Sequence, residues 1–118
     1  MFALLTNDDG IHAPGLAALD AALAGMGTLL TVAPAEEQSG MSHALTMNRP
    51  LRIIRHSHQR WAVSGTPVDC VYVAIHRVCE RFPDLVISGI NKGANLGDDV
   101  FYSGTVSYTH LRAHETIA

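Results

Sequence analysis

Short apolar runs alternate with segments of helical periodicity along the first third of the chain. The run 2–6 is too short for a helix and leads into the turn-forming residues 7–10, which predicts a buried strand followed by a turn. A helix is expected from Pro14, and a second apolar run at 28–33 predicts another strand. The apolar stripe of this helix is expected to consist of Leu16, Leu19, Leu23 and Met26. The pattern therefore predicts a β-α-β unit with parallel strands.

The middle of the chain predicts a hairpin and a second helix. Residues 51–54 and 60–63 are expected to pair around the polar turn 56–59. Thr66, followed by Pro67 and by Asp69 three positions after it, is typical of a helix start. The helix is expected to continue to Phe82, where Pro83 ends it, and a buried parallel strand is expected over 84–88.

Three polar loops follow the ends of predicted strands, at residues 7–10, 36–43 and 89–97. In a doubly wound sheet, ligands bind outside the carboxyl ends of the strands. We therefore expect the three loops to converge on one edge of the sheet and to form a functional site there.

The adjacent carboxylates Asp8 and Asp9 repel each other unless a cation or hydrogen-bond donors compensate. Oxygen ligands suit a hard cation, so the pattern favours a site for one Mg²⁺, Mn²⁺ or Ca²⁺ ion. A simple turn closed by an Asx-type hydrogen bond explains the same residues. The spacing of Gly89, Gly93 and Gly97 lets the backbone approach an anion, although a flexible surface loop is equally consistent with it.

Composition narrows the class of protein. The 118 residues and 12.7 kDa suffice for one domain, and 47% hydrophobic residues can fill its core. A net charge of −3 without a Lys/Arg run argues against binding a nucleic-acid polymer. The sequence has no apolar stretch near the roughly 20 residues of a membrane span. Cys70 and Cys79 fall on opposite faces of one predicted helix, so we expect free thiols and a cytoplasmic protein.

Four segments, taken together and in order, resemble the SurE-type (stationary-phase survival protein E) 5′-nucleotidases. They are Leu4–Gly10, Ser39–Thr46, Ser64–Cys70 and Asp84–Gly97, the last running on to Tyr102–Val106. The resemblance covers residues 1–106, and it implies a three-layer, Rossmann-like α/β domain with a mostly parallel sheet. It also implies a metal-dependent phosphatase that releases phosphate from nucleoside 5′-monophosphates, in a parent protein that is a homodimer or homotetramer.

The resemblance also implies roles for particular residues. The metal ligands would be Asp8, Asp9, Ser39 and Asn91. The phosphate would be surrounded by Gly40, Ser42, Asn95, Ser103, Gly104 and Thr105. One of the two aspartates would orient or deprotonate the attacking water. An aspartyl-phosphate mechanism is disfavoured, because it needs a second Asp two positions after the nucleophile.

The resemblance ends at Val106, and residues 107–118 look like a translated sequencing adapter rather than part of the domain. Members of the family are considerably longer, so we expect 1–106 to be the N-terminal part of a C-terminally truncated domain. Two alternatives to an active nucleotidase therefore stay open. One is a nucleotide- or phosphate-binding module without turnover, and the other is an inactive fragment.

Overall fold

The computed structural model describes residues 1–38, 44–90 and, for the backbone only, 101–103. Within these residues it contains one six-stranded sheet in the order β3-β4-β2-β1-β5-β6. The strands are β1 (Phe2–Thr6), β2 (Thr28–Pro34), β3 (Ile53–Ser57), β4 (Arg60–Val63), β5 (Leu85–Ser88) and β6 (Phe101–Ser103). The central pairs β1–β2, β1–β5 and β2–β4 are parallel, whereas β3–β4 and β5–β6 are antiparallel. The mostly parallel sheet expected from the sequence is confirmed.

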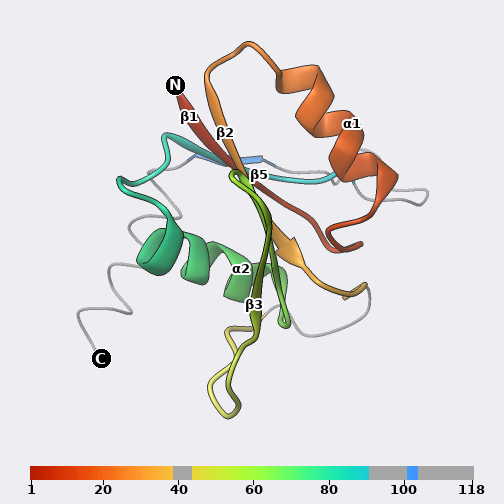
Figure 1. The fold of residues 1–118 in the computed structure, drawn as a ribbon, viewed down its shortest axis with the longest axis vertical. Helices are drawn as coiled ribbons and strands as arrows, with labels where there is room; N and C mark the ends of the chain where they lie inside the picture. Colours follow the sequence, from red (N-terminus) through yellow and green to blue (C-terminus); the bar gives the residue numbers. More distant parts are fainter. Residues whose placement is uncertain (39–43, 91–100, 104–118) are drawn as a thin grey trace.

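Helices α1 (Pro14–Leu23) and α2 (Pro67–Val73) cover opposite faces of the sheet (Figure 1). Under α2, Leu4 of β1 and Val32 of β2 belong to one buried cluster. Under α1, Leu5 of β1 belongs to a second cluster. The strand β1 is buried along its whole length because alternate side chains enter the two clusters. This is the expected three-layer arrangement.

The first helix is shorter than its apolar pattern predicts. It ends at Leu23, and the chain then turns through Gly25 and Gly27, both of which have positive φ. Leu16 is buried as expected, but Met26 lies beyond the helix and is 57% exposed, so its assignment to the buried stripe is wrong.

The second helix begins as predicted and ends early. Thr66 is the N-cap and forms a reciprocal capping box with Asp69. The last turn is a π-helix, η1 (Ala74–Val78), closed by a bond from the Cys79 N–H to the Ala74 carbonyl at 2.7 Å. The chain is already extended at Cys79, so the expected continuation to Phe82 is wrong. It must leave the helix there to run back to the amino end of β1, where the Asp84 N–H donates to the Phe2 carbonyl.

Two other expected boundaries are wrong. The first hairpin strand is β3, at 53–57 instead of 51–54, and only His58 and Gln59 remain in the turn. Leu51 does not enter the strand because it packs against the cluster under α2. The sequence pattern after β5 also predicts one long polar loop over 89–104, but strand β6 lies within this range and pairs with β5.

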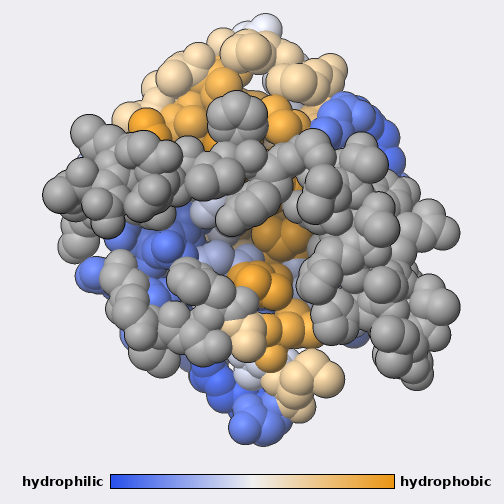
Figure 2. All heavy atoms as spheres, turned by 180° about the vertical axis from the view of Figure 1, so that it is seen from behind, coloured by the Kyte–Doolittle hydropathy of each residue, from blue (hydrophilic) through white to orange (hydrophobic). Residues whose placement is uncertain are grey.

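The surface of the described residues carries exposed apolar side chains as well as charged ones. From the side opposite to that of Figure 1, apolar residues gather in a band along the middle of the molecule (Figure 2). Strand β3 forms one edge of the sheet, and all five of its residues are exposed, including Ile53 and Ile54. None of the helices in the described part of the chain is long and apolar enough to cross a membrane.

Replacing Leu4 with alanine tests the role of β1 as the centre of the core. Leu4 is fully buried, so Leu4→Ala is expected to lower the free energy of unfolding by about 2–5 kcal/mol. Met26→Ala removes a comparable side chain from the surface and is expected to change it by less than about 0.5 kcal/mol. Urea unfolding measures both, and equal effects would contradict the described core.

Candidate metal and phosphate site

The carboxyl ends of β1, β2 and β5 lie at one edge of the sheet. Thr6 at the end of β1 pairs with Ser88 at the end of β5, and β2 runs parallel to β1 on its other side. Asp8 and Asp9 follow β1 after one intervening residue, so both belong to the loop at this edge.

Asn7 closes the loop that carries the two aspartates. Its buried side chain donates from Nδ2 to the Gly10 carbonyl at 2.9 Å, and its Oδ1 accepts the Gly10 N–H at 3.1 Å. Gly10 has a φ of +105°, which favours glycine. The expected Asx-type hydrogen bond is therefore present, but Asn7 makes it rather than an aspartate. Asp8 and Asp9 are left half-buried on the same turn.

The loop after β2 lies against the aspartate loop. The Gln38 N–H donates to the Asp8 carbonyl at 2.7 Å, and the Ile11 N–H donates to the Pro34 carbonyl at 2.8 Å. Gly10 lies directly against this loop, since a Cβ there would be in van der Waals contact with the backbone of Glu36 at 3.4 Å. The expected convergence of these two loops is confirmed.

The third loop starts at the same edge. The Gly89 N–H donates to the Thr6 carbonyl at 2.9 Å, which joins the chain leaving β5 to the end of β1. Ile90 then packs against the first turn of α1, where a Cβ on Gly15 would lie only 2.0 Å from the Ile90 carbonyl oxygen. The described starts of all three loops therefore meet at one edge.

The expected ligands and phosphate-binding residues are only partly within the described chain. Asp8 and Asp9 lie together on the first loop. The predicted residues outside the described chain are Ser39, Gly40, Ser42, Asn91, Asn95, Gly104 and Thr105. Ser103 pairs with Leu85, at the amino end of β5, so the backbone register does not bring it to the aspartate edge. Residues 1–38 and 44–90 contain no cluster of three or more His, Cys, Asp or Glu side chains suited to a metal, and the roles of the set stay predictions.

Asp69 is a residue whose importance the sequence reasoning underestimated. It is fully buried, and its carboxylate accepts from the Thr46 N–H at 2.6 Å, from the Thr46 hydroxyl and from the Thr66 N–H at 2.8 Å. The Thr66 hydroxyl donates to the Ala44 carbonyl at 3.0 Å. Asp69 therefore ties the start of α2 to the segment that directly follows Ser39–His43. The capping pattern identified the bond within the helix, but no local pattern indicates the contact with Thr46, which lies 23 positions earlier.

Removing the negative charge of Asp69 is expected to destabilise the fold. Its two carboxylate oxygens accept three donors, so the amide of Asp69→Asn must turn its NH₂ group toward at least one of them. We expect a loss of about 2–4 kcal/mol in the free energy of unfolding. Asp84→Asn is the matched control, because the exposed Asp84 carboxylate accepts the Phe2 N–H at 2.8 Å. Its loss is expected to be below about 1 kcal/mol, and urea unfolding that ranks the two variants in reverse would contradict this interpretation.

The two thiols are free, as expected. Burial raises the pKa of Cys70 far above its ordinary value, although the Thr6 hydroxyl acts in the opposite direction. Burial also raises the pKa of Cys79 to about 11. Because the thiolate is the nucleophile, neither cysteine is suited to covalent catalysis at neutral pH.

Alkylation by iodoacetamide tests this assignment. A raised pKa keeps the thiol protonated at pH 7, so Cys79 is expected to react slowly there and faster as the pH approaches about 11. Cys70 is expected to stay protected until the chain unfolds. In urea both thiols are expected to react as ordinary cysteines, with a pKa near about 8.5. Rapid labelling of the folded chain at pH 7, followed by peptide mass spectrometry, would overturn the assignment.

Comparisons with known proteins agree with the fold described above. The family model "Survival protein SurE" matches residues 3–116. The chain belongs to the SurE family. The match passes the expected end of resemblance at Val106, so the boundary there stays a prediction. Membership in the family, which the four sequence segments indicated, is confirmed.

Relatives and a solved structure support the same assignment. The chain is 57% identical over 104 residues to "5′-nucleotidase SurE" of Geotalea uraniireducens (strain Rf4), which covers 88% of this chain and 42% of that protein. It is 57% identical over 103 residues to the protein of the same name from Acinetobacter baylyi, with coverages of 87% and 40%. The crystal structure of the Sure protein from Aquifex aeolicus matches with a TM-score of 0.78 and 46% identity, over 91% of this chain and 44% of that one.

These matches confirm the Rossmann-like α/β fold of the SurE family. The chain spans about two fifths of the length of the curated relatives that it matches.

Proposed function

We propose that this chain belongs to a metal-dependent phosphomonoesterase that releases phosphate from nucleoside 5′-monophosphates. Membership in the SurE family and the name "5′-nucleotidase SurE" of its relatives support this activity. The structural observation that carries the proposal is the 2.7 Å bond from the Gln38 N–H to the Asp8 carbonyl. It joins the aspartate loop to the segment that enters Ser39, the next expected ligand.

The chemistry of the donor set fits a hard divalent cation. Asp8 and Asp9 supply two half-buried carboxylates on one turn, and Ser39 and Asn91 would add a hydroxyl and an amide oxygen. Chain connectivity supports the set, because Ser39 follows Gln38 and Asn91 follows Ile90, and both preceding residues are at the aspartate edge. A bound Mg²⁺, Mn²⁺ or Ca²⁺ ion would polarise a phosphoryl oxygen and lower the pKa of a bound water.

The remaining residues would bind the phosphate and stabilise its charge. Backbone N–H groups, hydroxyls and an amide would donate to the phosphoryl oxygens, whose charge is spread over them in the transition state. The proposed donors are Gly40, Ser42, Asn95, Gly104 and Thr105. Ser103 stays in the set because of the resemblance alone, since it pairs with Leu85 at the amino end of β5, away from the aspartate edge. One of Asp8 and Asp9 would orient or deprotonate the attacking water. The homodimeric or homotetrameric state and the cytoplasmic location stay predictions.

Phosphate release from 5′-AMP tests the activity and its dependence on metal. We expect the full-length protein to which this chain belongs to release phosphate with Mn²⁺, and the release to stop when EDTA removes the metal. Asp8→Asn and Asp9→Asn are each expected to lower the rate at least about 100-fold, because several kcal/mol of transition-state stabilisation are lost. Asp20→Asn is the matched control, since it makes the same change on α1, outside the candidate site. The Geotalea uraniireducens relative serves as the positive control for the assay.

Each outcome of this assay has a definite meaning. Turnover like that of the wild type in either aspartate variant would remove that carboxylate from the mechanism. Metal-dependent binding of 5′-AMP without phosphate release, while the relative is active, would leave the chain as a binding module. Neither binding nor release would leave it as an inactive fragment.

A further inference from the structure

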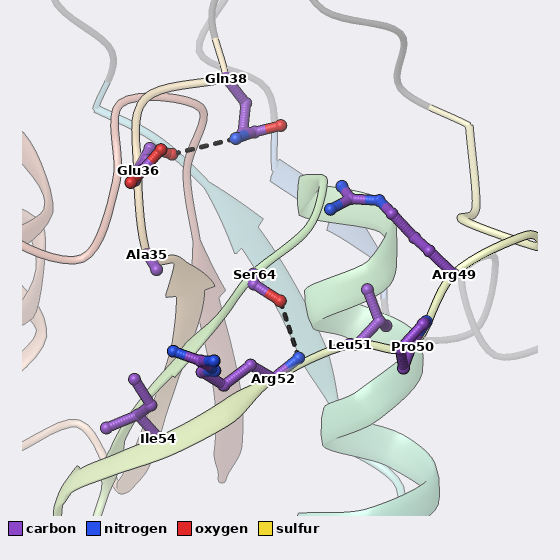
Figure 3. A pocket seen from close by; sticks show the side chains of 9 residues that line it. All are labelled: Ala35, Glu36, Gln38, Arg49, Pro50, Leu51, Arg52, Ile54 and Ser64. Carbon is purple, nitrogen blue, oxygen red and sulfur yellow. Dashed lines mark hydrogen bonds between the residues drawn. The ribbon is translucent and has the colours of Figure 1, made fainter.

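A cavity of about 820 Å³ lies against the loop that follows β2 (Figure 3). It is bounded by the loop after β2, the segment that leads into β3, and the end of β4. Gln38 contributes its side chain to the cavity wall, while its backbone N–H donates to the Asp8 carbonyl. The cavity and the candidate metal site therefore share one wall. Its volume is in the range of pockets that bind small organic ligands.

The wall opposite Gln38 is held in place by backbone bonds. The Arg52 N–H donates to the Ser64 hydroxyl at 2.7 Å, and the Ser64 N–H donates to the Arg52 carbonyl at 2.9 Å. Leu51 anchors the same segment by packing against the cluster under α2. These contacts fix the backbone from which the side chain of Arg52 extends toward the cavity (Figure 3).

The side chains of the cavity combine cationic, anionic and apolar groups. Arg49 and Arg52 are exposed, and neither makes an ion pair with a carboxylate among the described residues. Glu36 supplies one carboxylate, and Leu51 and Ile54 supply apolar surface. In Figure 3 both arginine side chains extend from the segment before β3 toward the side on which the loop after β2 lies.

We propose that this cavity binds the nucleoside portion of the substrate, with Arg49 and Arg52 as specificity-determining residues. Guanidinium groups stack on planar rings, so the two arginines would contact the base. Glu36 and Gln38 would form hydrogen bonds with the ribose hydroxyls. The proposal rests on the proposed function, since the phosphate of a nucleotide held here must reach the adjacent aspartate edge.

The same composition argues against a subsite for a second phosphate. Arg49 and Arg52 would attract a phosphate as well as a planar ring, but Glu36 offsets part of their charge, and Leu51 and Ile54 offer a polyanion only apolar surface. A second phosphate would therefore leave this carboxylate and this apolar surface without a matching partner. A neutral, planar and hydroxyl-bearing group matches all of these side chains at once.

Binding of adenosine in the presence of EDTA tests the subsite without using the metal or the phosphate. Isothermal titration calorimetry of the 118-residue chain is expected to detect saturable binding. Arg49→Ala and Arg52→Ala are each expected to raise the dissociation constant about tenfold, and Arg52→Lys is expected not to restore it, because lysine keeps the charge but loses the planar group. Arg77→Ala removes an exposed arginine from η1, which does not line this cavity, and is expected to bind like the wild type.

Three results would overturn the subsite. They are no adenosine binding by the wild-type chain, equal binding by the arginine variants, and a loss of affinity for tripolyphosphate but not for adenosine in those variants. Adenosine binding that depends on the arginines, with no phosphate release from 5′-AMP by the full-length protein, would contradict the proposed function and leave the nucleoside subsite standing. Phosphate release from 5′-AMP without adenosine binding would contradict the nucleoside subsite and leave the proposed function standing.

Discussion

The hydrogen bond between the Gln38 N–H and the Asp8 carbonyl is the contact on which the candidate site depends. It is possible because β1 and β2 are parallel neighbours, so that their carboxyl ends leave the sheet at the same edge. Gly10 supplies the positive φ that the aspartate turn needs, and the Asn7 side chain holds that turn in shape. The same loop after β2 also lines the neighbouring cavity, so one contact relates the proposed metal chemistry to the proposed recognition of the nucleoside.

Much of the fold is encoded in local patterns. The β-α-β unit, the Thr66 capping box and the continuous apolar run of β5 each depend on residues close together in sequence. Boundaries were less predictable because tertiary contacts decide them. Leu51 joins the core instead of strand β3, and the helix ends at Val78 because the chain must return to β1. Residues 101–103 form a strand only through pairing with β5, which no local pattern contains.

For the candidate site, the meeting of two loops was predictable from the sequence, whereas the role of Asp69 and the neighbouring cavity were not. Residue types and the order of strand ends indicated that the loops of Asp8 and Gln38 would meet, since parallel topology alone requires it. The role of Asp69 was hidden because its partner Thr46 lies in an irregular segment with no periodicity. The cavity beside the edge was hidden for the same reason. Glu36, Arg49 and Arg52 line it together, and nothing local in the sequence signals that these separated residues share one cavity.

The lack of a side chain at Gly15 determines how closely helix α1 approaches the chain that leaves β5. With no Cβ between them, the first turn of α1 and the Ile90 carbonyl are in direct backbone contact. Backbone atoms cannot change rotamer to absorb a displacement, as a side chain does. Any side chain at position 15 would therefore push the start of α1 away from the chain that leaves β5.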